Sequence, residues 1–136
     1  MTARTAALTV VLSAFAVCAG LAFQQAKRSP TPKPAQKMMS YKADVAPFMT
    51  KYCLPCHTED MMNPSELYLD SYQSLMAGGK HGKSLVAGNP DSSLLVRKLT
   101  AAPPFGDPMP MKRKSPIPQD SLKILSQWIK QGAKNN

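Results

Sequence analysis

The segment Cys53-Leu54-Pro55-Cys56-His57 constrains this chain more than any other feature. Two thiols three positions apart on one turn can both reach the two vinyl groups on one edge of a haem, and the following imidazole can lie under the iron. His57 would bind iron through one ring nitrogen and hydrogen-bond through the other, often to a loop carbonyl. The motif therefore predicts one covalent haem c, attached through Cys53 and Cys56, with His57 as an axial iron ligand.

Other uses of these side chains agree less well with the rest of the sequence. A zinc site needs four protein ligands, and outside the motif only His81 is of the usual kind. A redox dithiol would follow a strand within a βαβ pattern, which this sequence lacks. A disulfide between Cys53 and Cys56 would be strained on a helical turn. With Cys18 the cysteine count is three, an odd number that argues against a disulfide framework.

A methionine-containing loop offers the iron a sixth ligand. Met109 lies in the Pro-rich segment 106–111, where a stiff backbone can hold a thioether toward the far side of the haem. Thioether ligation raises the reduction potential and suits electron transfer. Met111 is the alternative in the same loop, and His81, as a distal imidazole, is a third. An iron with no sixth ligand would instead bind small molecules.

The first forty residues look unlike a folded core. Residues 1–24 combine Arg4 with an apolar run over 6–23, which predicts a signal peptide or an N-terminal membrane anchor. Lipidation at Cys18 is a further alternative. Residues 25–40 are rich in proline and lysine and predict an extended linker. The protein is therefore expected to be exported, either periplasmic or anchored in the membrane and facing the periplasm.

Residues 41–133 are expected to form one small domain of about four helices joined by long loops. Apolar residues at helical spacing mark these helices, and six prolines between residues 102 and 118 forbid regular structure there. No convincing strand is present, so the fold class is all-α. The predicted helix starts are Asp44, Asp70, Asn89-Pro90 and Asp120, and the last helix ends near Gln131.

Taken together, residues 41–133 resemble the monohaem class I cytochromes c, and more narrowly the planctomycete-type cytochrome c domain. The resemblance implies a cytochrome c-like fold in which the N- and C-terminal helices cross and a methionine loop closes the far side of the haem. The family's Met-Pro ligand step falls on Met109-Pro110, and Met111 stands where that family more often has proline. The matching segments are Val45-Ala46-Pro47-Phe48, the CLPCH motif, Leu67-Tyr68-Leu69-Asp70, Gly78-Gly79-Lys80, Gly88-Asn89-Pro90, Met109-Pro110 and Trp128-Ile129.

The formal net charge of +9 indicates which classes of partner the chain can bind. Lysine and arginine are scattered rather than gathered on one helix face, so nucleic-acid binding is not expected. A basic surface suits a redox partner with an acidic docking surface, or anionic lipid. The expected function is single-electron transfer without enzymatic activity of its own. The alternatives are a membrane-anchored subunit of an oxidoreductase or respiratory complex, and a five-coordinate haem sensor or catalyst.

Overall fold

The computed structural model describes residues 36–111 and 114–136. The predicted leader, residues 1–24, and residues 25–35 of the predicted linker lie outside the described residues. Gln36–Asn136 forms a compact unit. No helix within the described part of this unit is long and apolar enough to span a bilayer.

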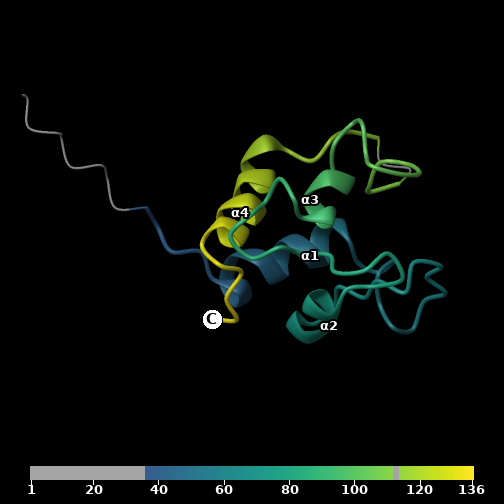
Figure 1. The fold of residues 1–136 in the computed structure, drawn as a ribbon, viewed down its shortest axis with the longest axis horizontal. Helices are drawn as coiled ribbons and strands as arrows, with labels where there is room; N and C mark the ends of the chain where they lie inside the picture. The colour runs from purple at the N-terminus through teal and green to yellow at the C-terminus, as the bar shows by residue number, and fades with distance from the viewer. Residues whose placement is uncertain (1–35, 112–113) are drawn as a thin grey trace, which may run out of the picture. The chain divides into compact units, whose positions relative to one another are not determined.

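The described residues are helical, with long loops between the helices and no strand. This confirms the predicted all-α class and the small cytochrome c-like fold of about four helices. The first α-helix continues directly from a short π-helical segment, η1. The elements are η1 (Tyr41–Val45), α1 (Ala46–Tyr52), α2 (Tyr72–Ala77), α3 (Leu94–Lys98) and α4 (Gln119–Lys130) (Figure 1).

The N-terminal and C-terminal helices lie against each other, as the resemblance implied. η1 packs on α4, and the rings of Tyr41 and Trp128 lie 5.7 Å apart. Further along, the hydroxyl groups of Tyr52 and Ser121 are 3.2 Å apart and join α1 to α4. Trp128 is buried, so both ends of the domain meet around one large apolar side chain.

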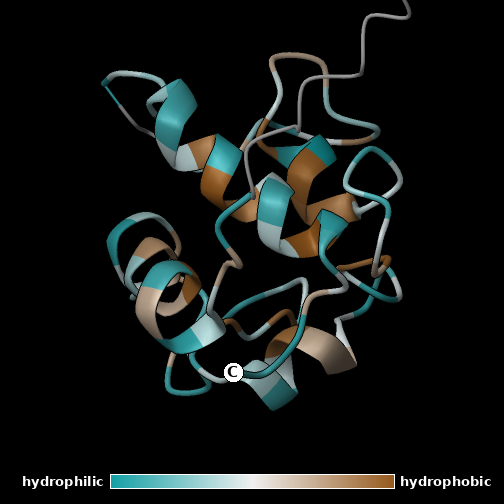
Figure 2. Cartoon of the chain, turned by 90° about the vertical axis from the view of Figure 1, so that its left-hand side faces the viewer, coloured by the Kyte–Doolittle hydropathy of each residue, from teal (hydrophilic) through white to brown (hydrophobic). Residues whose placement is uncertain are grey.

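The core explains the apolar periodicity of the helices. Val45, Leu75 and Ile129 are fully buried, each on a different helical segment. Figure 2 shows helices that carry hydrophobic residues on one side and hydrophilic residues on the other. Tyr72 ties α2 to the C-terminal segment, because its hydroxyl donates to the Ala133 carbonyl at 2.9 Å.

The domain begins slightly before the predicted boundary. Met39, placed in the predicted linker, is only 5% exposed, and its N–H donates to the Gln131 side chain at 2.7 Å. The first helix is capped by Ser40 rather than Asp44: the Ser40 hydroxyl accepts from the Ala43 N–H at 3.2 Å. Asp44 accepts from the Ser40 N–H at 2.9 Å in return, a reciprocal pairing like that of a capping box but one position further along the chain.

Two other helix starts also differ from the prediction. Ser71, not Asp70, caps α2, because its hydroxyl accepts from the Ser74 N–H at 3.0 Å. α3 begins at Leu94 rather than Pro90. Asn89 instead uses its side-chain oxygen to accept from the Ser92 N–H, which forms a turn ahead of the helix. The local preference for a turn therefore prevailed over the preference of Asn-Pro for a helix start.

Candidate cofactor site

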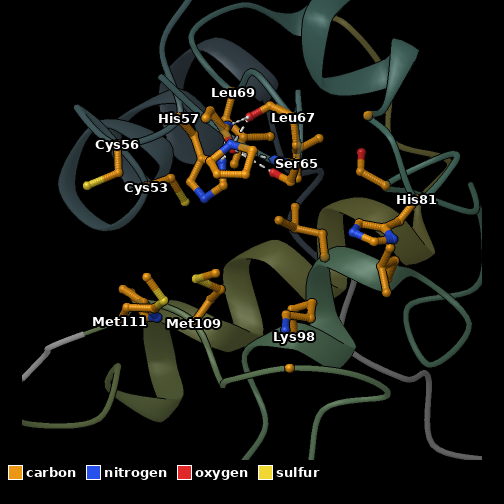
Figure 3. Close-up of a pocket in the computed structure, with 18 of the residues that line it drawn as sticks. Cys53, Cys56, His57, Ser65, Leu67, Leu69, His81, Lys98, Met109 and Met111 are labelled. Atoms are coloured by element: carbon orange, nitrogen blue, oxygen red, sulfur yellow. Dashed lines mark hydrogen bonds between the residues drawn. The ribbon is translucent and has the colours of Figure 1, made fainter. Parts of the chain in front are cut away.

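A cavity of about 520 Å³ lies between the Cys53–His57 segment and the loop that follows α3. Its volume falls within the range of about 300–1,000 Å³ typical of small-molecule and cofactor sites. Leucines from several segments contribute to its lining. Every candidate site residue from the sequence also lines it, namely Cys53, Cys56, His57, His81, Met109 and Met111 (Figure 3).

Both motif cysteines are free and lie on the turn that follows α1. The turn is closed by the His57 N–H, which donates to the Cys53 carbonyl at 3.2 Å. Cys53 is buried against the sulfur of Met49, at 3.7 Å, and Cys56 is exposed. Burial raises the pKa of the Cys53 thiol to about 12. The two thiols thus occupy the same end of the cavity in different environments.

The His57 ring is fixed by one of its nitrogens. Nδ1 lies 2.8 Å from the carbonyl oxygen of Leu67, to which it donates when it carries the ring proton. The backbone supports this contact, since the Leu69 N–H donates to the His57 carbonyl at 2.8 Å. In Figure 3 the other ring nitrogen points into the cavity. In the tautomer that carries its proton on Nδ1, His57 presents a lone pair to the cavity, which an axial iron ligand requires.

Asn63 belongs to the same site, although no motif in the sequence marks it. Its side-chain nitrogen donates to the Leu67 carbonyl at 2.6 Å and lies 3.0 Å from Nδ1 of His57. Its side-chain oxygen accepts from the N–H of Ser65 at 3.1 Å and from the Ser65 hydroxyl at 2.7 Å. The Asn63-Pro64 pair marks a turn in the sequence, but nothing local indicates that the amide faces a histidine.

Lys98, at the end of α3, holds the loop that carries the two methionines. Its ammonium donates to the carbonyls of Phe105 and Asp107, at 2.6 Å each. Its own carbonyl accepts from the Met109 N–H at 2.7 Å. Met109 is partly buried, whereas Met111 is 56% exposed. Both line the cavity, and Met109 is the one whose backbone is tied to a helix.

His81 and Lys98 lie on the side of the cavity away from the cysteines (Figure 3). The His81 side chain is exposed, and its ring stacks on Phe105 with 4.4 Å between the centroids. Among the described residues no three His, Cys, Asp or Glu side chains gather closely enough to hold a metal ion.

The residues around the cavity fit a covalently attached haem. Two free thiols and a histidine with an available nitrogen come from one segment, and thioethers come from another. Leucines that line the cavity provide the apolar surroundings that a porphyrin requires. They are Leu54, Leu67, Leu69, Leu94, Leu95 and Leu99.

The comparison with protein families agrees with this geometry. The family model described as planctomycete cytochrome C matches residues 53–110. A search of curated proteins finds no match. Among solved structures, Kuenenia stuttgartiensis hydrazine synthase matches with a TM-score of 0.48 and 22% sequence identity, over 73% of this chain and 16% of that chain. The segment that matches the planctomycete cytochrome c family, residues 53–110, carries both thiols, the histidine and the Met-Pro step.

Proposed function

We propose that this domain transfers single electrons through one haem c, bound covalently by Cys53 and Cys56 and ligated by His57. One observation carries the proposal: both thiols and the free nitrogen of His57 border one cavity, while Nδ1 is engaged 2.8 Å from the Leu67 carbonyl. The bound group would supply an iron that alternates between ferric and ferrous states. The chain would attach it, orient the iron ligand and exclude water.

Met109 is proposed as the second axial ligand. Met109 lines the cavity and is less exposed than Met111. Its N–H donates a hydrogen bond to the Lys98 carbonyl at the end of α3. A held thioether loses less conformational freedom on binding iron than an exposed one. Met111 is the competing ligand. The other candidate function, a five-coordinate sensor or catalyst, would leave both methionines unbound.

The test is an optical spectrum of the haem-loaded, full-length protein, recorded reduced and oxidised, with and without carbon monoxide. We expect the sharp reduced bands of a six-coordinate haem, unchanged by the gas. Met109→Ala should abolish the weak near-infrared sulfur–iron band, and the matched Met111→Ala should keep it. The opposite pattern would assign the ligand to Met111. Carbon monoxide binding by the wild type would favour the sensor or catalyst.

A second test concerns attachment. Haem should resist acid-acetone extraction from the wild type and should be extracted from the Cys53→Ala/Cys56→Ala double variant. Each single variant should retain haem through one thioether. Release of haem from the wild type would contradict covalent binding, and an unchanged spectrum in His57→Ala would contradict its role as ligand.

We further propose that the protein acts outside the cytoplasm and docks redox partners with acidic surfaces. The basic composition, with a net charge of +9, supports this kind of partner. The apolar run over residues 6–23 supports export, and also a second candidate, a membrane-anchored subunit of a larger oxidoreductase. Sequencing the N-terminus of the mature protein distinguishes them, because cleavage near residue 24 leaves no anchor.

A further inference from the structure

Two side-chain nitrogens lie within hydrogen-bond distance of the Leu67 carbonyl oxygen. His57 Nδ1 lies 2.8 Å from this oxygen, and the Asn63 side-chain nitrogen lies closer, at 2.6 Å. The two nitrogens are themselves 3.0 Å apart. A carbonyl oxygen has two lone pairs and can accept both bonds. When Nδ1 carries the ring proton, as an iron-binding His57 requires, the Leu67 carbonyl accepts from both the imidazole and the neutral amide.

The orientation of this amide is determined by its other end. The Ser65 N–H, 3.1 Å from the Asn63 side-chain oxygen, can only donate a hydrogen bond, so the oxygen must face Ser65. The amide nitrogen must then face Leu67 and His57. The turn is also held from outside, because the Lys80 N–H donates to the Ser65 carbonyl at 2.8 Å. Asn63 is thus fixed with a donor directed at the partner of His57.

We propose that Asn63 is a positioning residue that weakens the electron donation of His57 to iron by sharing the Leu67 carbonyl. The inference rests on the proposed role of His57 as an iron ligand. A stronger hydrogen bond from Nδ1 makes an imidazole a better donor and stabilises ferric iron. The Asn63 bond draws on the same oxygen, so less of its electron density is available to the His57 N–H. The wild-type potential is consequently higher than it would be without the amide.

Two substitutions at Asn63 separate this effect from a merely structural one. Both Asn63→Ser and Asn63→Asp keep an oxygen able to accept from the Ser65 N–H, so both preserve the turn. Asn63→Ser removes the amide donor and leaves the Leu67 carbonyl to His57. Asn63→Asp replaces the amide donor with a carboxylate oxygen, which the Leu67 carbonyl repels and which offers the adjacent Nδ1–H of His57 a stronger acceptor. The matched control is Asn89→Asp, the same change in an exposed turn outside the cavity lining.

The experiment is redox titration of the haem-loaded proteins, with carbon monoxide binding as a second readout. We expect the potential to fall from wild type to Asn63→Ser and further to Asn63→Asp, with no gain in carbon monoxide binding. Asn89→Asp should stay near the wild-type potential. The proposal is overturned if Asn63→Ser matches or exceeds the wild type, if Asn89→Asp shifts as far as Asn63→Asp, or if the Asn63 variants bind carbon monoxide where the wild type does not. A wild type without attached haem would instead contradict the proposed function itself.

Discussion

Replacing Lys98 with alanine should loosen the loop that carries Met109. The ammonium of Lys98 donates to the carbonyls of Phe105 and Asp107 at 2.6 Å each, and it lies 4.7 Å from the centre of the Phe105 ring. Alanine removes all three contacts. The backbone bond from the Met109 N–H to the residue-98 carbonyl can remain. The loop then keeps its attachment to α3 and loses the contacts that close it.

The size of the effect follows from these contacts. A typical net hydrogen bond contributes about 1 kcal/mol, and both of these lie near solvent. The cation–π contact adds about 0.5 kcal/mol at an exposed site. Allowing for water that replaces part of the loss, the closed loop should be destabilised by about 2 kcal/mol. That free energy corresponds to about a thirtyfold larger population of the open loop.

The assay is the rate at which cyanide binds the ferric, haem-loaded protein at low cyanide, where the rate is proportional to the population of the open loop. Lys98→Ala should bind about thirtyfold faster than the wild type, and Lys98→Arg should recover most of the difference. The control is Lys123→Ala, which removes the same charge from an exposed ion pair with Asp120, 2.8 Å long. Equal rates in Lys98→Ala and wild type, or an equal rise in Lys123→Ala, would refute the clamping role of Lys98.

Two further predictions concern the haem-free protein and the turn that supports His57. Iodoacetamide should modify exposed Cys56 well before buried Cys53, whose pKa is raised to about 12. The modification rate of Cys53 should climb about tenfold per pH unit below that value. Mass spectrometry measures both modification rates, and equal rates at pH 8 would contradict the burial of Cys53. Gly79→Ala should lower the free energy of unfolding by about 1–3 kcal/mol, because the new Cβ would lie 2.6 Å from the Ser65 carbonyl oxygen, a backbone atom that cannot move aside. Chemical denaturation measures this free energy. A change below about 0.5 kcal/mol would show that the turn can shift.

Features that depend on neighbours within a turn or two could be predicted from the sequence. The helical spacing of apolar residues located the helices, because burial of one helix face repeats every three to four residues. The Cys53–His57 spacing indicated the chemistry for a similar reason, since all three side chains come from one turn. Helix starts were less accurate: Ser40 and Ser71 compete with nearby aspartates as caps, and either residue type can serve.

The sequence alone determined the helical class, the CLPCH motif and the methionine loop, because each is set by local spacing. Only the tertiary structure decided which distant groups meet. Met39 joins the core through Gln131, ninety-two residues away. Lys98 reaches back over its own loop, and Asn63 shares a carbonyl with His57, because irregular backbone directs those groups and leaves no period in the sequence. The motif thus predicts that iron can be bound, whereas the folded loops determine how firmly each ligand is held.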